Sequence, residues 1–569
     1  MTEAPRSFAV STGNDEGGLS LGSPVFSDPA LARHAERFGN VAAWKKALSG
    51  SSPAVAAAAV GGDFAIALRE ADERSTLAID RFAIRTLCYR VVDGQLRYAA
   101  RADELSDPGC ALDPQAIFDY LYFHVIPSPR TIFAGVQRLP PGHVAVFERG
   151  RLTVAPYWKP SFREPDRPSF EALRTEFRQL LRDAVLRQLD GSRPACFLSG
   201  GTDSSTVAGI IGEVAERPAA SYSIGFDAEG YDEMAYARIA ARRFNTKHHE
   251  YYVTPDDLVR SIAQVAGSYD QPFGNSSVLP AYWCARFAHD DGVTRLLAGD
   301  GGDELFGGNS RYAMQRVFGW YSQLPAPLRS GVLDPFFGLA STKKLPLLRQ
   351  ASGYVRHANT PMPDRLQHYN LLLRLGMPEV LTAAFMSHVS EAAPLDAQRA
   401  VWDATGDASA INAMLAYDWR YTLAESDLPK VVGSAQLAGI AVGFPFLDQA
   451  LVDFSLRLPA AYKLKGLRLR WFFKEALRGF LPDEIITKRK KGFGLPFGVW
   501  VNRHEKLKQL AVDSLRSFAG RGVVRPEFIK TLLGTYLQAH PGYYGEMVWI
   551  LMMMEQWLRQ HAPRYRVDA

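Results

Sequence analysis

Residues 196–209 read CFLSGGTDSSTVAG, a pattern typical of a strand, a tight loop and a helix. An apolar strand is expected to end at Leu198, after which Gly200 and Gly201 let the backbone turn tightly and present its N–H groups. A helix beginning near Ser205 would point the positive end of its dipole at the same place. The stretch therefore predicts a cradle for a polyphosphate anion.

An acid lies inside this loop. The carboxylate of Asp203 would repel phosphates unless a divalent cation lay between them, so Asp203 is predicted to be a magnesium ligand. The loop differs from the Walker loop, because Gly-x-x-x-x-Gly-Lys followed by Ser or Thr occurs nowhere in the sequence. The competing interpretation is a Gly-Ser turn between a strand and a helix.

A second loop supports the first. Residues 294–308 read TRLLAGDGGDELFGG, a short apolar run followed by glycines and three acids, Asp300, Asp303 and Glu304. Oxygen ligands on a loop at the carboxyl end of a strand suit magnesium. Ligands of open α/β sheets bind outside those strand ends, so the two loops could share one nucleotide. A solvated acidic turn or a weak calcium loop is the alternative, and the acid spacing of an EF-hand is missing.

The rest of the sequence predicts an α/β protein. SYSIGF, HHEYYVT and TRLLAG are strand candidates separated by helical stretches, which favours a doubly wound parallel sheet. Ser169 is expected to cap a helix with an apolar face. Residues 1–155 read as a β-rich domain, 156–169 as a proline-rich linker and 170–569 as the domain that holds both loops, with a largely helical part after residue 310.

Composition limits the function classes. The chain has 569 residues, of which 47% are hydrophobic and 22% charged, and its formal net charge is +5. The basic residues are dispersed except at 488–491, where a rigid loop is expected to deliver Lys490 to a phosphate rather than to nucleic acid. No secretory signal is visible in the polar N-terminus, and the apolar run 547–554 is too short to span a bilayer. A cytoplasmic enzyme is expected.

With these two loops, the chain resembles the synthetase domain of asparagine synthetases. The resemblance covers nearly the whole chain through further motifs: SIGF (223–226), DEMAYARIAARRFNTKHHE (232–250), DQPFGNSS (270–277), GFPFLD (443–448) and KRKKGFGLPFGVW (488–500). The first domain matches weakly, through GGDFAIAL (61–68), DRFAIRTLCYR (80–90) and SPRTIFAGVQRLPPGH (128–143). The resemblance implies a glutaminase-like domain of the N-terminal-nucleophile type, followed by an ATP-pyrophosphatase domain.

The resemblance also implies a reaction and a set of site residues. ATP would be cleaved between its α and β phosphates, a carboxylate adenylated, and AMP displaced by a nitrogen nucleophile, with pyrophosphate as the other product. By the same resemblance, Asp203 and Asp303 would bind magnesium, and the pyrophosphate cradle would be formed by Ser199, Gly200, Gly201, Ser204 and Ser205. Adenosine would be bound by Leu198, Ile224, Ala298 and Gly299. Asp300 would accept the proton from the attacking nitrogen, and Arg470 and Lys490 would bind phosphate. ATP and Mg²⁺ are the implied cofactors.

The first domain departs from the family. Members that take nitrogen from glutamine begin Met-Cys and expose a nucleophilic cysteine, whereas this sequence begins Met1, Thr2, Glu3. Its four cysteines lie inside apolar segments, and the family's glutamine-recognising segments are absent from residues 1–55. We therefore expect a degenerate glutaminase domain with a structural role, and nitrogen from ammonia, from an amine or from a separate glutaminase.

The synthetase part departs as well. Val432, Gly433, Ala441 and Gly443 stand where asparagine synthetases carry four charges, which makes aspartate a doubtful substrate. Arg470 replaces a lysine, and a guanidinium binds phosphate but does not give up a proton. In motif detail the chain is most similar to the asparagine-synthetase-like amidotransferases of exosortase and exopolysaccharide gene clusters.

Several alternatives remain open at this stage. Relatives without the terminal cysteine include lasso-peptide cyclases and small-molecule, β-lactam-like cyclases, which close a ring with an amine of the substrate. A catalytically silent scaffold is opposed by the retained Asp203 and Asp303. An enzyme that transfers sulfur onto tRNA would be expected to carry reactive cysteines and a basic face, and neither is evident in this sequence. The expected partners are a small-molecule or peptide carboxylate and an amine or ammonia, with a precursor peptide, a separate glutaminase and a homodimer left open.

Overall fold

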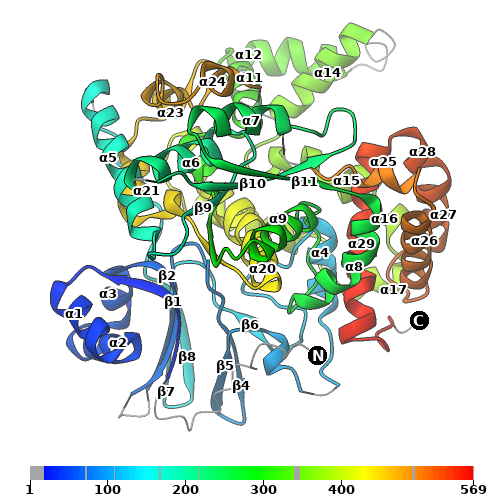
Figure 1. The fold of residues 1–569 in the computed structure, drawn as a ribbon. Helices are drawn as coiled ribbons and strands as arrows, with labels where there is room; N and C mark the ends of the chain where they lie inside the picture. The colour runs from blue at the N-terminus through cyan, green and yellow to red at the C-terminus, as the bar shows by residue number, and fades with distance from the viewer. Residues whose placement is uncertain are drawn as a thin grey trace.

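The computed structural model describes residues 18–70, 74–107, 109–165, 168–215, 217–338, 346–489, 492 and 494–567. The chain forms an antiparallel β-rich part at its N-terminal end and a larger part built around a parallel sheet (Figure 1). The predicted α/β class is confirmed. Within the described ranges, every helix is too short or too polar to cross a lipid bilayer.

The β-rich part contains two antiparallel sheets. A five-stranded sheet has the order β1-β2-β3-β7-β8, and a three-stranded sheet has the order β5-β4-β6. The strands are β1 Leu19–Phe26, β2 Val60–Arg69, β3 Ser75–Ile79, β4 Cys88–Val92, β5 Gln95–Ala99, β6 Gln137–Arg138, β7 His143–Glu148 and β8 Arg151–Pro156. Helices α1 Pro29–Phe38, α2 Asn40–Gly50 and α3 Pro53–Ala58 bury Trp44 against Phe64 of β2. Alternating side chains of β2 thus face two separate small cores.

The second part is built on a parallel sheet with the order β11-β10-β9-β12-β13. Its strands are β9 Ala195–Phe197, β10 Ala220–Phe226, β11 Lys247–Val253, β12 Arg295–Leu297 and β13 Ala441–Gly443. The chain winds outward from β9 through β10 to β11 and then returns to place β12 on the other side of β9. This reversal between neighbouring strands is the place where open α/β sheets bind ligands.

Helices cover this sheet on both faces (Figure 1). They are α5 Phe170–Gln188, α6 Thr202–Val214, α7 Met234–Arg243, α8 Pro255–Ser268, α9 Val278–Asp290 and α20 Leu428–Ala438. The predicted cap at Ser169 is confirmed, because its side chain accepts a hydrogen bond from the backbone N–H of Ala172. The predicted start of α6 near Ser205 is wrong by three residues. The helix begins at Thr202 because Gly200, with a φ of +69°, completes the turn just before it.

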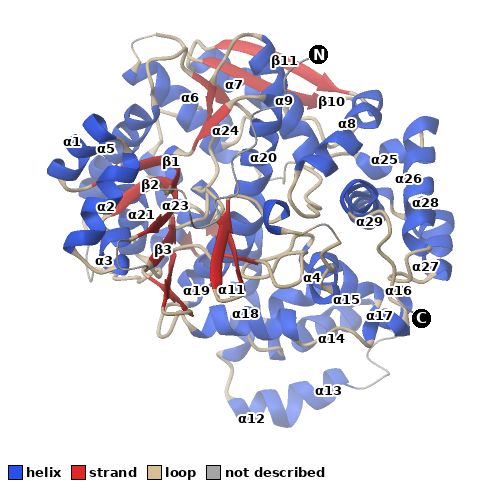
Figure 2. Cartoon of the chain, turned by 90° about the horizontal axis from the view of Figure 1, so that it is seen from below, coloured by secondary structure: helices blue, strands red, loops and turns tan. Residues whose placement is uncertain are grey.

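After residue 310 the described chain is mainly helical, as predicted. The longer helices are α11 Ser310–Ser322, α14 Pro346–Asn359, α18 Ala393–Asp403, α19 Ala410–Asp418, α21 Gln449–Arg457, α26 Glu505–Ala519 and α29 Pro541–His561. Figure 2 shows α25 (Phe497–Val501) to α29 gathered on one side of the molecule, away from the β-rich part. The apolar run 547–554 is fully buried inside α29 and belongs to the protein core.

The two parts of the chain share their largest core. Helix α4, Pro114–Phe123, comes before the predicted boundary at residue 155, yet its buried side chains pack in the same cluster as Tyr222 of β10 and Trp549 of α29. Tyr120 of α4 also donates a hydrogen bond of 2.8 Å to the backbone carbonyl of Ile550. The β-rich part is therefore joined to the parallel sheet by buried apolar surface as well as by the linker.

Candidate active site

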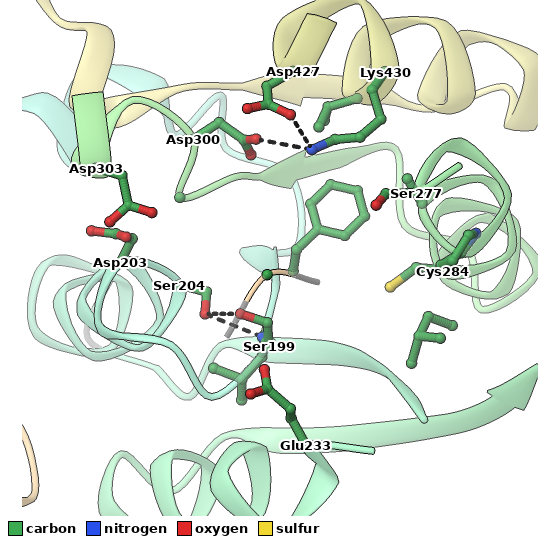
Figure 3. A pocket seen from close by; sticks show the side chains of 18 of the residues that line it. Ser199, Asp203, Ser204, Glu233, Ser277, Cys284, Asp300, Asp303, Asp427 and Lys430 are labelled. Carbon is green, nitrogen blue, oxygen red and sulfur yellow. Dashed lines mark hydrogen bonds and ion pairs between the residues drawn. The ribbon is translucent and has the colours of Figure 1, made fainter. Parts of the chain in front are cut away.

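A cavity of about 550 Å³ opens at the carboxyl ends of β9 and β12. The residues that follow β9 form one wall, and the residues that follow β12 form the opposite wall (Figure 3). Seven of the residues predicted from these loops and β10 line the cavity together with Asp303: Leu198, Ser199, Asp203, Ser204, Ile224, Gly299 and Asp300. Sequence positions 100 residues apart thus meet at the sheet reversal, as the parallel topology requires.

The loop after β9 is held by its own serines. The hydroxyl of Ser204 accepts a hydrogen bond of 3.1 Å from the backbone N–H of Ser199, and the two side-chain oxygens lie 3.0 Å apart (Figure 3). Gly200 packs directly on α7, because a Cβ at this position would lie 2.4 Å from the backbone nitrogen of Ala237. The loop is therefore close-packed beneath and open above, where Ser199 is exposed.

Three predicted cradle residues lie in this loop or helix without lining the cavity. Gly200 and Gly201 form the turn, and Ser205 is fully buried within α6, where its hydroxyl has no hydrogen-bond partner in the described structure. Ala298, predicted near adenosine, is also buried beneath the surface of the cavity. Their contribution to nucleotide binding stays a prediction.

The loop after β12 approaches the first loop closely. A Cβ at Gly299 would lie 2.7 Å from the backbone nitrogen of Ser204, and a Cβ at Gly302 would lie 2.1 Å from Oδ1 of Asp203. Any larger residue at either position would collide with the first loop. Glycine in the GDGGDE segment thus allows the carboxylates of Asp203 and Asp303 to point toward one another (Figure 3).

Arg470 joins these two carboxylates. Its Nη1 atom donates hydrogen bonds of 2.7 Å to Asp203 and 2.8 Å to Asp303, and its Nη2 atom also donates to Asp203. The guanidinium is 4% exposed and lies 3.9 Å from the ring centroid of Phe473, so it does not line the cavity. A direct contact between Arg470 and pyrophosphate stays a prediction. What the structure adds is that Arg470 neutralises the two predicted metal ligands.

The donor set fits a magnesium ion. The two carboxylates already converge on one cation, Arg470, and their oxygens are hard ligands. The described residues contain no group of three or more His, Cys, Asp or Glu side chains that could hold a metal. Magnesium bound here would take two protein ligands, with phosphate oxygens and water completing its shell, as is usual for nucleotide sites.

A buried lysine that was not predicted from the sequence lines another part of the cavity. Lys430 of α20 places its Nζ 3.0 Å from Asp427 and 3.7 Å from Asp300 (Figure 3). Burial alone would lower the pKa of Lys430, but Asp427 and Asp300 outweigh it and raise that pKa above its ordinary value. Burial also raises the pKa of Asp300. A carboxylate whose proton affinity is increased is suited to accept a proton.

A second buried acid, Glu304, also lines the cavity. Glu304 is 8% exposed, and burial together with Asp427 raises its pKa to about 8. Glu304 is one of the three acids of the second loop, and no separate role is predicted for it from the sequence.

The basic segment 488–491 reaches the first loop through its first residue. Lys488 lies 3.2 Å from Glu233, which lines the cavity, and 3.4 Å from the carbonyl oxygen of Gly200. Lys490 lies outside the described residues, so its predicted contact with phosphate stays a prediction. Lys488 could have been found from the same charge cluster, since it precedes Lys490 by two residues.

The four cysteines lie in environments that disfavour the thiolate. Cys88, Cys196 and Cys284 are buried, and burial raises the pKa of Cys88 and of Cys196 to about 12 and that of Cys284 further. Cys110 is partly exposed, and burial raises its pKa as well. No cysteine of this sequence is therefore poised as a thiolate. Thr2 lies outside the described residues.

Comparisons with known proteins agree with the two-part organisation. A family model described as asparagine synthase matches residues 176–559, and one described as a glutamine amidotransferase domain matches residues 50–158. Asparagine synthetase (glutamine-hydrolyzing) 1 of Bacillus subtilis is 22% identical over 484 residues, covering 84% of this chain and 74% of that protein. Amidase chyE of Penicillium rubens is 25% identical over 500 residues, covering 79% and 72%. Because the asparagine synthase model matches more than half of this chain, the chain belongs to the asparagine synthase family.

Proposed function

We propose that this protein is an ATP-dependent ligase that adenylates a carboxylate and transfers the acyl group to ammonia or an amine. Family membership supports ATP-dependent amidation. The observation that carries the finer proposal is the meeting of two glycine-rich loops at the sheet reversal, with two carboxylates around one cation. This arrangement suits a polyphosphate whose negative charge must be balanced as it leaves.

The cavity is lined by both apolar and polar side chains. The apolar ones include Phe197, Leu198, Tyr222, Ile224, Pro280, Ala281 and Cys284. These suit an adenosine, whereas Ser199 and Ser204 lie beside the acids where a triphosphate would pass. Bound Mg²⁺ would supply positive charge at Asp203 and Asp303.

The acyl transfer would proceed in two balanced steps. An oxygen of the substrate carboxylate attacks the α-phosphorus of ATP, the bond from that phosphorus to the bridging oxygen breaks, and pyrophosphate leaves. The nitrogen then attacks the acyl carbon, the bond to the AMP oxygen breaks, and Asp300 accepts the proton that the nitrogen loses. Lys430 lies beside Asp300 and holds its carboxylate in place.

Pyrophosphate exchange tests the proposal. Purified protein is incubated with ATP, Mg²⁺, labelled pyrophosphate and a panel of carboxylic acids, and label in ATP is measured. Acid-dependent exchange, with AMP as the nucleotide product when an amine is added, is expected. Formation of ADP and phosphate in place of AMP would contradict adenylation.

A further inference from the structure

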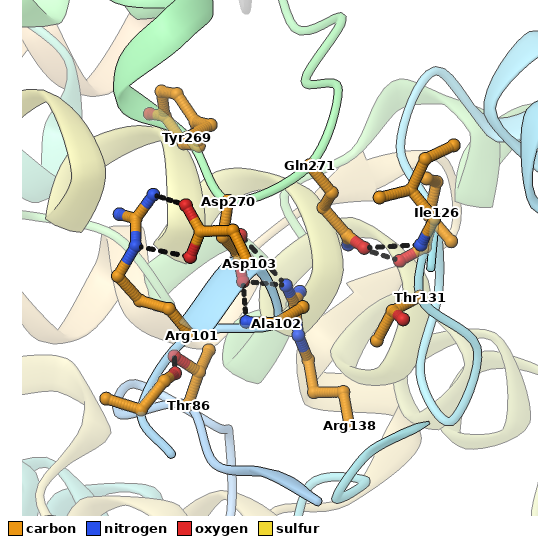
Figure 4. Close-up of polar contacts among 12 residues, drawn as sticks. Thr86, Arg101, Ala102, Asp103, Ile126, Thr131, Arg138, Tyr269, Asp270 and Gln271 are labelled. Carbon is orange, nitrogen blue, oxygen red and sulfur yellow. Dashed lines mark hydrogen bonds and ion pairs between the residues drawn. The ribbon is translucent and has the colours of Figure 1, made fainter. Parts of the chain in front are cut away.

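Residues of the β-rich part donate hydrogen bonds to Asp270, in the segment between helices α8 and α9. Arg138 of β6 donates hydrogen bonds of 3.2 and 3.1 Å to the two carboxylate oxygens of Asp270, and the backbone N–H of Ala102 donates to the same carboxylate at 2.9 Å (Figure 4). The side chains of Arg138 and Asp270 are only 10% and 13% exposed. Burial alone would raise the pKa of Asp270, yet Arg138 and Arg101 hold that pKa below its usual value. Asp270 is therefore a buried anion whose cation comes from the other part of the chain.

The residue before this anion contacts the helix that carries Lys430. The hydroxyl of Tyr269 donates to the backbone carbonyl of Pro429 at 3.1 Å and to that of Lys430 at 3.4 Å. The tyrosine ring also lies directly against α20, because a Cβ at Gly433 would lie 2.5 Å from ring atom Cζ. Asp270 and Tyr269 are adjacent, so fixing one restricts the other.

This contact occurs at the first turn of α20, beside the lysine that reaches Asp300. The carbonyls that Tyr269 contacts belong to Pro429 and Lys430, and the Lys430 ammonium lies 3.7 Å from Asp300. A small shift of the first turn would change that distance, and misplacing a catalytic group by about 1 Å can cost about a hundredfold in rate.

We propose that Arg138, Asp270 and Tyr269 are positioning residues that let the β-rich part set the place of Lys430 beside Asp300. Removing a single member of a buried ion pair is strongly destabilising, whereas a buried pair adds little net stability over an apolar one. The pair is thus better explained by the fixed geometry that it imposes than by stability. The β-rich part then has a role in ligation that requires no glutamine hydrolysis.

Hydrogen exchange tests the coupling without reference to the reaction. In Tyr269→Phe, the amides of 428–438 are expected to exchange about fivefold faster, the change that one lost hydrogen bond would give. Arg138→Gln, which leaves Asp270 buried without this cation, should speed exchange of 428–438 more than that of the rest of the described chain, and Arg138→Lys should do so less. Arg130→Gln is the matched control, because Arg130 lies in the same part of the chain but pairs with Asp113 and Asp119 on its own side.

Kinetics add the functional readout. If the proposed adenylation is observed, Tyr269→Phe should lower kcat for amide formation about fivefold and leave the KM for ATP unchanged. This part rests on the proposed function, whereas the exchange measurement does not. Unchanged exchange of 428–438 in both Tyr269→Phe and Arg138→Gln would overturn the inference, and so would equally faster exchange throughout the protein.

Discussion

Arg470 donates two hydrogen bonds to the carboxylate of Asp203, so the acid predicted to bind magnesium already has a cation beside it. The same guanidinium reaches Asp303 at 2.8 Å. Arg470 adopts a left-handed backbone conformation, with a φ of +54°, just before helix α23 (Trp471–Ala476). The two carboxylates are therefore held close together by a protein charge as well as by the loops that carry them.

Replacing either acid should remove nearly all turnover. Asp203→Asn or Asp303→Asn keeps the shape of the side chain but removes the negative charge that would hold Mg²⁺ against phosphate. Pyrophosphate exchange measures the loss, and Asp183→Asn on the exposed face of α5 is the control. Near-normal exchange in either active-site variant would contradict the metal assignment.

Arg470 should affect both rate and metal dependence. Arg470→Ala is expected to lower the rate by about two to three powers of ten, as for other lost charge-stabilising groups. It also leaves Asp203 and Asp303 without their protein cation, so Mg²⁺ should raise the thermal unfolding temperature of the variant more than that of the wild type. Unchanged activity in both Arg470→Ala and Arg470→Lys would show that a different basic residue binds phosphate.

The two loops were predictable because each is a short local pattern. Glycines between an apolar run and acids specify a turn and a site together, and Asp203 and Asp303 lie in such runs. The parallel sheet followed from the alternation of strands and helices, and its reversal brings the loops together.

Lys430 could not be found in the same way. It lies in a mainly apolar helix about 130 residues after Asp300, and a single lysine there is typical of a solvent-facing position. Only tertiary packing buries it. The local sequence, Asp427 followed by Pro429, is compatible with the first turn of a helix but carries no sign of burial.

The charge of Lys430 should be needed for activity. Lys430→Met leaves Asp300 and Asp427 without their shared cation, and we expect a loss of about two powers of ten in kcat. Lys430→Arg should recover part of this activity. Lys465→Met, which removes an exposed lysine over Trp471, is the control. A Lys430→Met variant with wild-type kcat would show that Asp300 works without the lysine.

Stability should fall as the pH rises from about 4.5 to 7 because of Glu546. Burial raises the pKa of this side chain from 4.5 to about 7, and its neighbour Ser276 donates a hydrogen bond of 3.2 Å. In that window the unfolded chain has lost the proton while the folded protein keeps it, so folding is weakened as pH rises, by about 3 kcal/mol at full deprotonation.

Glu546→Gln removes this titration. The unfolding temperature of the variant relative to the wild type should therefore be higher at pH 8 than at pH 5, with the exposed Glu527→Gln as control. A difference between Glu546→Gln and the wild type that is the same at both pH values would show that Glu546 keeps an ordinary pKa in the folded protein.

This chain should not hydrolyse glutamine. A glutaminase needs an activated nucleophile, and burial raises the pKa of all four cysteines, outweighing Arg138 beside Cys88 and Arg90 near Cys110. The partly exposed Cys110 lies against the carbonyl oxygens of Ala111 and Ala134, which cannot take a proton from it. We expect glutamate release at background level with ATP and Mg²⁺ present, while ammonia or an amine supports product formation. Glutamate release above background would overturn this prediction, and its loss in Thr2→Ala would identify the Thr2 hydroxyl as the nucleophile.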